Sequence, residues 1–385
     1  MTAIHKFYVL PDLICALVSI LGATFLFWEL LRLGWFRGSL LRRSALTACW
    51  IAASLVFLLT WLFCFARVSF AFPPRMVEWT QAFGLIGGFC VTCAAVLVAL
   101  LRRVPRPFRE DRRDLFRAAG AMALVTPPVV AAFGIIDRTQ FRVTETKLAV
   151  PNLPRDLQGL RMVQVTDVHL SPFLSEKEMA RAVDMANETR AHVAFMTGDL
   201  ITRPGDPLDA CIRQIARLRA DAGVYGCLGN HEIYCGTEAY VTRECARRGI
   251  RFLRSEATDL RFGAATIHLA GVDYQPMHSV YLQGAESLVA PDKFNLLLSH
   301  NPDVFRVAAH QGWNVVLSGH THGGQVNVEI LRQNLNVARF FTPWVRGPYH
   351  LGSSAIYVSS GIGTIGMPMR LGAPPEISVV QLCAI

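Results

Sequence analysis

The hydrophobic residues of this chain form four long runs before residue 140 and many short runs after it. The long runs cover residues 11–31, 44–66, 79–101 and 115–136. Each is about 20 residues long, the length that a helix needs to cross the hydrocarbon core of a bilayer. A cleaved signal peptide would carry one shorter apolar stretch. The pattern therefore predicts a membrane domain of about four helices over residues 1–140.

The fourth run is the weakest of these spans. Gly120, Pro127 and Pro128 interrupt it, although membrane helices tolerate proline where neighbouring groups satisfy the freed backbone. We keep it as a span, and the side of the membrane that the rest of the chain faces depends on it.

Short apolar runs alternate with amphipathic stretches from residue 141 to residue 385. The short runs predict strands at 162–165, 193–196, 224–228, 266–270, 296–298, 315–317 and 355–358. The amphipathic stretches predict helices at 175–189, 207–219, 237–248 and 303–310. This alternation predicts an α/β domain over residues 141–385, in which layers of helix and sheet surround one core.

The formal charge of +9 lies almost wholly in the predicted membrane domain. Residues 1–140 hold 15 Lys and Arg against 7 Asp and Glu, and the remaining residues hold 23 against 22. A nucleic-acid-binding protein would instead cluster its Lys and Arg on the soluble part, so no nucleic-acid partner is predicted.

The arginines of the connecting loops predict the orientation in the membrane. Four arginines lie between residues 32 and 43, two in the second loop at 67 and 75, and seven between residues 102 and 117. Arginine-rich loops stay in the cytoplasm. Four spans then make a multi-pass protein of the inner (cell) membrane with the C-terminal domain on the outer, periplasmic side. If the fourth run does not span, this domain faces the cytoplasm.

Polar residues follow five of the predicted strands, directly where each strand ends. They are Asp167 with His169, Asp199, Asn230 with His231, His300, and His320 with His322. Carboxylate, amide and imidazole groups suit divalent Mn, Fe, Zn or similar ions. Without His231, the seven residues are too many for one tetrahedral ion and fit two ions that share a bridging ligand.

The order of these blocks, DxH, GD, GNHE, H and GHTH, resembles the calcineurin-like metallophosphoesterase superfamily over residues 140–385. GHTHGGQ at 319–325 and GIGT at 361–364 resemble its bacterial branch of membrane-associated phosphodiesterases and lipid-precursor pyrophosphatases. The resemblance implies a four-layer αββα sandwich that follows an all-α transmembrane domain. It also implies two divalent metal ions as cofactors.

The resemblance further implies a role for each residue of the blocks. The implied ligands are Asp167, His169 and His322 for a first ion, Asn230, His300 and His320 for a second, and Asp199 as the bridge. His231 would contact the phosphate and protonate the leaving oxygen. Glu232, which follows it, would orient an imidazole.

These features predict a membrane-anchored, metal-dependent phosphoesterase that hydrolyses phosphodiester or pyrophosphate bonds, including those of lipids. One alternative is a nucleotide-lipid pyrophosphatase of the UDP-diacylglucosamine type, but its cytoplasmic substrate conflicts with the predicted topology. Another is a binding or scaffold protein that has kept the fold and lost the chemistry, against which the intact ligand set argues. A transporter lacks support because the spans contain no row of ionisable residues.

For some residues outside the blocks, a structural interpretation is preferred to a functional one. We expect Glu29 to pair with Arg32 near the end of the first span rather than to act within the membrane. We expect buried thiols rather than a Cys235–Cys245 disulfide, although the spacing leaves the disulfide open. Five histidines match no block and are expected at the surface or hydrogen-bonded in the core: His192, His268, His278, His310 and His350.

Two further segments fit both a structural and a functional interpretation. Asp273 follows a predicted strand as a ligand would, and we interpret it as a turn residue. Residues 339–348 hold Phe340, Phe341 and Trp344. They form either a loop that contacts lipid or a segment that packs on the core.

Overall fold

The computed structural model describes residues 4–63, 72–103, 110–277, 279–330 and 333–385. The chain divides into two compact units, which are described separately here. The N-terminal unit comprises Met1–Ile135 together with Gly366–Pro368. The C-terminal unit comprises Ile136–Ile365 and Met369–Ile385.

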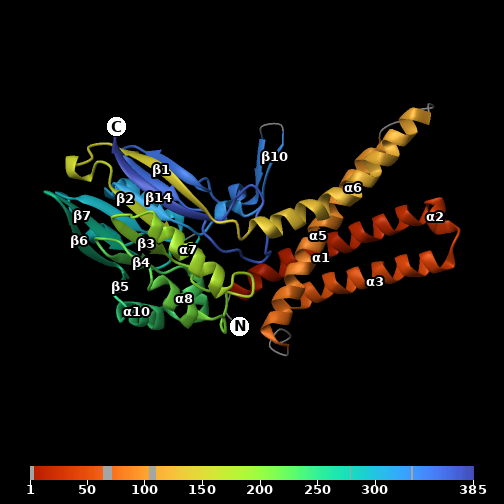
Figure 1. Ribbon diagram of the computed structural model, residues 1–385, viewed down its shortest axis with the longest axis horizontal. Helices are drawn as coiled ribbons and strands as arrows, with labels where there is room; N and C mark the ends of the chain where they lie inside the picture. Colours follow the sequence, from red (N-terminus) through yellow and green to blue (C-terminus); the bar gives the residue numbers. More distant parts are fainter. Residues whose placement is uncertain (1–3, 64–71, 104–109, 278, 331–332) are drawn as a thin grey trace. The chain divides into compact units, whose positions relative to one another are not determined.

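Long helices make up the N-terminal unit (Figure 1). They are α1 (Ile4–Leu31), α3 (Leu40–Leu62), α5 (Pro74–Arg103) and α6 (Glu110–Asp137), with a short α2 (Gly34–Arg37) between the first two. Among the described residues, four segments are long and apolar enough to cross a membrane: Leu13–Leu31, Leu40–Leu62, Arg75–Arg103 and Ala118–Asp137. The four predicted apolar runs lie on these helices, apart from Phe63, which caps the end of α3, and residues 64–66, which fall outside the described residues. Pro127 and Pro128 lie inside α6 without ending it.

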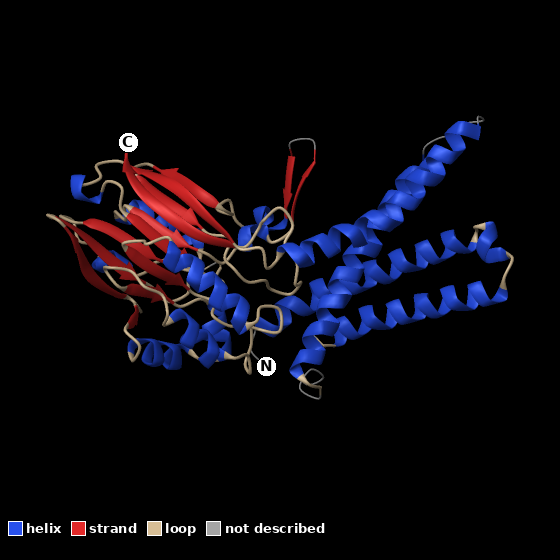
Figure 2. Cartoon of the chain, viewed as in Figure 1, coloured by secondary structure: helices blue, strands red, loops and turns tan. Residues whose placement is uncertain are grey.

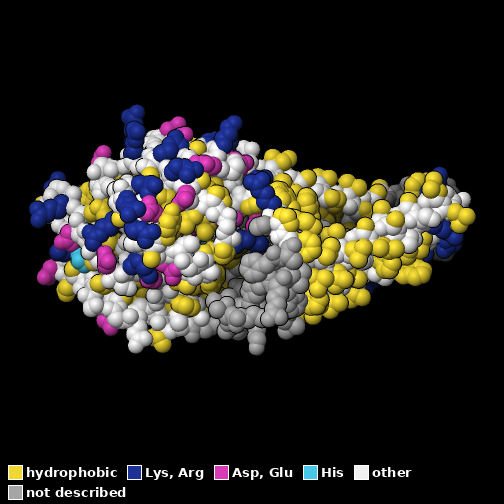
Figure 3. Space-filling model, turned by 90° about the horizontal axis from the view of Figure 1, so that it is seen from below, with side chains coloured by type: hydrophobic (Ala, Val, Ile, Leu, Met, Phe, Trp, Pro, Cys, Tyr) yellow, Lys and Arg dark blue, Asp and Glu magenta, His cyan; other side chains and the backbone are white. Residues whose placement is uncertain are grey.

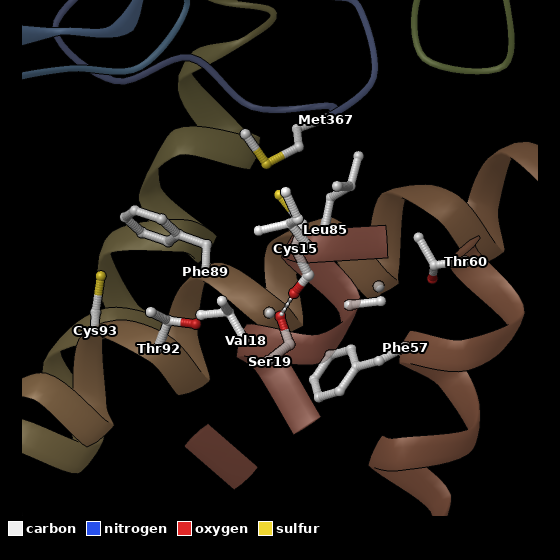
Figure 4. Close-up of a pocket in the computed structure, with 14 residues that line it drawn as sticks. Cys15, Val18, Ser19, Phe57, Thr60, Leu85, Phe89, Thr92, Cys93 and Met367 are labelled. Atoms are coloured by element: carbon white, nitrogen blue, oxygen red, sulfur yellow. Dashed lines mark hydrogen bonds between the residues drawn. The ribbon is translucent and has the colours of Figure 1, made fainter. Parts of the chain in front are cut away.

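Small residues let α5 pack closely on α1 and α3. A side chain at Gly84 would overlap Thr60 of α3, and one at Gly88 would overlap Ser19 of α1. This spacing of four residues is a common packing device of membrane helices. A cavity of about 350 Å³ remains between these helices, and Figure 4 shows Ser19, Phe57 and other residues that line it.

Glu29 of α1 forms the ion pair with Arg32 that the sequence predicts. Its Oε1 lies 2.9 Å from Arg32 Nη1. The same oxygen also lies 2.9 Å from Nη1 of Arg102 on α5, a partner that the sequence did not reveal. One carboxylate therefore links the ends of two apolar helices.

Two six-stranded sheets form the C-terminal unit (Figure 2). The first has the order β1 (Arg142–Val150), β14 (Glu376–Ala384), β2 (Arg161–Val165), β3 (Val193–Thr197), β4 (Val224–Cys227) and β5 (Ile250–Phe252). The second has the order β12 (Gly347–Leu351), β13 (Ser354–Val358), β9 (Val315–Ser318), β8 (Phe294–Leu298), β7 (Ala265–Gly271) and β6 (Glu256–Phe262). A separate hairpin joins β10 (Asn327–Ile330) to β11 (Gln333–Asn336).

Five α-helices accompany these sheets in the described part of the unit. They are α7 (Glu176–Glu188), α8 (Leu208–Ile215), α9 (Asn230–Cys235), α10 (Glu238–Ala246) and α11 (Phe305–Gln311). The helix predicted at 207–219 ends early, at Ile215. The one predicted at 303–310 begins with a 3-10 turn, Pro302–Val304, before α11.

Three apolar clusters define the layers. The cluster between the two sheets contains Phe195 from the first sheet and Leu317 and Tyr357 from the second. A second cluster packs α7, α8 and α10 on the outer face of the first sheet, and a third packs α11 on the outer face of the second. The order helix, sheet, sheet, helix confirms the predicted α/β sandwich, which follows four apolar helices in the sequence. On the face drawn in Figure 3, charged side chains are spread over the C-terminal unit, whereas hydrophobic side chains predominate on the N-terminal helices.

Candidate metal centre

The strands of both sheets deliver the predicted ligands to one place. Asp167 and His169 follow the end of β2, Asp199 follows β3, and Asn230 follows β4; His300 follows β8, and His320 and His322 follow β9. Strands β2, β3 and β4 are parallel to one another, as are β8 and β9. Their carboxyl ends therefore meet at one edge of each sheet, and loops at such an edge commonly carry binding residues.

The backbone is strained at this edge. A positive φ angle, which side chains other than glycine seldom adopt, occurs at Asp167 (49°), His169 (45°), Asp199 (56°), His320 (73°) and His322 (52°). Each such residue costs on the order of 1–3 kcal/mol and persists only where the surroundings hold it. Strain that gathers at five of the seven predicted ligands indicates a functional site.

Two glycines make room for the carboxylates. A Cβ atom at Gly229 would overlap Asp199, and one at Gly319 would overlap Asp167. The glycines of the GNH and GHTH blocks are thus required because a carboxylate lies against their backbone.

Among the residues that the structure describes, three sets of side chains lie close enough to hold an ion. They are Asp167, His169 and His322; Asp199, His300 and His320; and His169, Asp199 and His231. In each set, one ligand atom per residue lies within 4.8 Å of the others. Nε2 of His322 lies 3.4 Å from Asp167 Oδ1 and 3.1 Å from His169 Nε2. Asp199 belongs to two sets, since its Oδ2 lies 3.5 Å from His169 Nε2 and 3.1 Å from His300 Nε2.

Burial and the neighbouring charges shift the pKa values in opposite directions. Burial lowers the pKa of His169 and of His320 to about 3 and raises that of Asp167 to about 6. Burial acts against the charge of His300, but attraction to Asp199 outweighs it and raises the pKa of His300 to about 10. Without metal, the proton on His300 therefore compensates the charge of Asp199.

The donor set fits divalent cations. Asn230 Oδ1 is buried and has no hydrogen-bond partner in the described part of the chain, which is costly for an oxygen unless a further group satisfies it. The surrounding histidines hold the pKa of Asp199 well below its usual range, although burial opposes them. Neutral imidazoles at His169 and His320, an ionised carboxylate at Asp199 and an unsatisfied amide oxygen are the form in which such groups bind metal, whereas His300 must first release its proton.

A family model described as "Calcineurin-like phosphoesterase" matches residues 160–324, the part of the chain that supplies every one of these residues. The chain carries a calcineurin-like phosphoesterase domain. The superfamily that the sequence blocks indicate is thereby confirmed.

Curated relatives of the phosphoesterase domain include proteins that are named for membrane spans. The chain is 30% identical to "Transmembrane protein with metallophosphoesterase domain" of Bos taurus, over 69% of this chain and 62% of that protein. It is 28% identical to the protein of the same name in Danio rerio, over 68% and 62%. It is 27% identical to "Uncharacterized metallophosphoesterase YkuE" of Bacillus subtilis (strain 168), over 71% and 96%. The chain thus matches less than two thirds of the length of the first two. The names of the first two and the four apolar helices support association with a membrane.

His231 belongs to the ligand set that also contains His169 and Asp199. Its backbone N–H donates to Asp199 Oδ1 at 3.0 Å. Its Nδ1 lies 2.6 Å from the carbonyl oxygen of Thr202, to which it must donate. Nε2 is then the nitrogen that is free to exchange a proton or to bind an ion. The ring also lies edge-on to His169, with the centroids 4.8 Å apart.

Glu232 has a different partner from the imidazole that the sequence led us to expect. Its carboxylate is fully buried and accepts backbone N–H groups from Gly229 (2.8 Å), Asp199 (3.0 Å) and Leu200 (2.7 Å). Burial raises its pKa, and the charge of Asp199 raises it further. Glu232 therefore holds the backbone of Asp199, the predicted bridging ligand, because its carboxylate accepts hydrogen bonds from the N–H groups of Asp199 and Leu200.

Arg370 is a residue of the site that no pattern in the sequence indicated. Its side chain is fully buried and donates to the carbonyl oxygens of His322 (3.0 Å), Ser360 (2.8 Å) and Gly363 (3.1 Å). It thereby ties the GIGT segment to the loop of His322. The GIGT letters marked only a family resemblance, and nothing near Arg370 in the sequence indicates burial.

The residues to which the sequence analysis assigned no role at the site lie outside the three ligand sets, as far as the structure describes them. His192 accepts from the backbone of Arg161, His268 pairs with Asp259, and His350 contacts the carbonyl of Ala149. Asp273 pairs with Arg254 at 2.7 Å. His310 lies in the last turn of α11, and His278 lies outside the described residues. The described cysteines, Cys235 and Cys245 among them, are free thiols, as expected from the sequence.

Proposed function

We propose that this protein is a membrane-anchored, metal-dependent phosphoesterase that works with two divalent ions. One observation carries the proposal: two buried sets of ligand atoms lie side by side and are linked by Asp199. Relatives that are named metallophosphoesterases support the same activity. A site for one ion would use only about half of these donor groups.

The ligands divide between two ions. Asp167, His169 and His322 would hold the first, Asn230, His300 and His320 would hold the second, and Asp199 would serve both. Such ions, when bound, supply the Lewis acidity that makes water a nucleophile near neutral pH and that offsets phosphoryl charge. The protein's own contribution is to hold the donors rigidly, as the strained backbone and the Glu232 contacts do.

His231 is proposed as the general acid. The Thr202 carbonyl holds Nδ1–H, so that Nε2 faces the substrate and donates its proton to the departing oxygen. Ion binding by His231 is the competing role, because its ring lies in one of the three ligand sets. The metal content of a His231 variant distinguishes the two roles. Replacing a general acid leaves the bound ions in place, whereas replacing a ligand removes one.

The proposed substrates are phosphodiesters or pyrophosphates, including those of lipids, on the outer side of an inner membrane that the chain spans four times. The helical Ala118–Asp137 segment supports the fourth span on which this orientation depends. A nucleotide-lipid pyrophosphatase would need the cytoplasmic side. A reporter fused after Ile385 distinguishes them: alkaline phosphatase, active only outside, should be active, whereas green fluorescence from a fusion at the same residue would contradict the orientation.

Hydrolysis by the purified full-length protein tests the activity. We expect bis-p-nitrophenyl phosphate to be cleaved faster than the monoester, in the presence of Mn, Zn, Mg or Ni. Asp199→Ala should abolish the cleavage. The matched control is Asp184→Ala, since Asp184 is exposed on α7 and forms its ion pair with Arg217 at the surface. Full activity of Asp199→Ala would refute the proposed mechanism, and an inactive wild type that contains metal would favour a scaffold.

A further inference from the structure

A short segment beside the metal centre exposes two consecutive phenylalanines. We call residues 337–346 the aromatic loop. Phe340 and Phe341 are 84% and 67% exposed. Trp344, the third aromatic residue, packs instead on Phe305 and Tyr349, with ring centroids 5.1 and 5.2 Å apart. The loop thus packs one aromatic side chain against the core and presents the other two outward.

Hydrogen bonds fasten the aromatic loop to the ligand loop on both sides of the phenylalanines. Before them, Asn336 donates to the carbonyl of Gly323 at 2.9 Å. After them, the carbonyl of Val345 accepts from Thr321 at 2.6 Å, and Thr321 stands between His320 and His322. The phenylalanines are therefore held next to the metal centre, and their exposure is not the result of a loose loop.

The aromatic loop also lies at the end of the sheet that is nearest to the membrane link. Arg346, the last residue of the loop, lies 3.3 Å from Glu376. Glu376 pairs in register with Arg142, the first residue of β1. The apolar span ends at Asp137, so the chain between it and Arg142 extends at most about 18 Å. One end of the sheet carries the metal centre, the aromatic loop and the link to the membrane.

We propose that Phe340 and Phe341 insert into the lipid surface in which this chain is anchored, so that the metal centre receives phosphate esters of membrane lipids. Phenylalanine partitions to the boundary between headgroups and acyl chains. Arg339, exposed directly before the pair, places a cation at the height of the anionic headgroups. The lipid-ester part of this inference rests on the proposed phosphoesterase function, whereas the membrane contact does not.

Photo-cross-linking of the full-length protein tests the contact without requiring activity. Benzoylphenylalanine replaces Phe341 in protein reconstituted in nanodiscs of phosphatidylcholine and phosphatidylglycerol. Leu21, 69% exposed on α1, is the positive control, and Ile385, 82% exposed, is the negative control. Ile385 follows the far end of β14, about 27 Å along the sheet from Arg142. We expect lipid adducts at positions 341 and 21 and none at 385. Adducts at 341 only to a second copy of the chain, or none at all, would overturn the proposal.

A pair of substrates tests the consequence for catalysis. Methyl p-nitrophenyl phosphate stays in water, whereas hexadecyl p-nitrophenyl phosphate enters the bilayer, and both release the same leaving group. Phe340→Ser/Phe341→Ser should lower kcat/KM for the hexadecyl ester by about tenfold or more, the effect of losing one buried aromatic side chain. It should leave the methyl ester unchanged. An equal effect on both esters, or on neither, overturns the proposal. A wild type that cleaves neither ester refutes the phosphoesterase function instead.

Discussion

Replacing Glu232 with glutamine changes one buried carboxylate oxygen from an acceptor into a donor and leaves the shape of the side chain nearly unchanged. The side chain is fully buried and receives three backbone N–H groups. One oxygen accepts from Gly229 and Asp199, and the other accepts from Leu200. Glutamine can keep its oxygen toward the first two, but its NH₂ group must then face the N–H of Leu200.

The cost follows from these contacts. Losing one hydrogen bond to a charged acceptor, and leaving two donors opposed in a buried place, destabilises the fold by about 2–3 kcal/mol. The loop that bears Asp199 then loses part of its support. Partners that orient a metal ligand in this way typically contribute 10–100-fold to metal affinity, so we expect a loss of about that size in Glu232→Gln.

The assay is a titration of metal-free, full-length protein with Mn²⁺, read as recovered hydrolysis of bis-p-nitrophenyl phosphate. Glu256→Gln is the matched control, because Glu256 is 57% exposed and pairs with Arg251 at the surface. It should bind Mn²⁺ as the wild type does. If Glu232→Gln also shows wild-type affinity and unchanged thermal stability, then the carboxylate does not organise the loop of Asp199, and the reasoning is wrong.

Further predictions concern three other residues. His231→Gln should keep the metal content measured by mass spectrometry and lower kcat about 10²–10⁴-fold; loss of an ion would show that His231 is a ligand. His300, whose pKa is about 10 without metal, is protonated at pH 7 and must become neutral to bind. Metal binding should therefore release a proton and show a calorimetric heat that depends on the ionisation enthalpy of the buffer; a heat independent of the buffer would contradict this. Arg370→Met strands the carbonyls of His322, Ser360 and Gly363 and should cost about 3 kcal/mol, or roughly 6–12 °C in Tm, with a smaller loss for Arg370→Lys. Equal Tm values for Arg370→Met and the wild type would refute this role.

Seven strands were predictable because each is a short apolar run, and most of them end in a polar block. All seven exist, and each begins or ends within two residues of its prediction. The edge strand β1 was missed because residues 144–147 are four polar residues in a row, a pattern that also suits a loop. The buried β14 was missed as well, because no polar block follows it. The short β5 and the solvated β6 and β12 give equally weak signals, since their burial is partial.

The ligands at strand ends were predictable because parallel strands bring distant blocks to one edge. The contacts around them were not predictable, because they depend on how the two sheets face each other. Glu232 was assigned an imidazole partner from the family pattern, yet it accepts from backbone groups 32 and 33 residues away. Arg370 joins the site across 48 residues through backbone carbonyls, which carry no mark in a sequence.

The number of ions that the purified full-length protein binds tests the two-ion centre most directly. After reconstitution with Mn²⁺ and removal of free metal, mass spectrometry should find about two ions per chain. His320→Ala should lose one of them and Asp199→Ala both, whereas His268→Ala, altered outside the site, should keep both. A single ion in the wild type, or two ions retained in Asp199→Ala, would contradict the account.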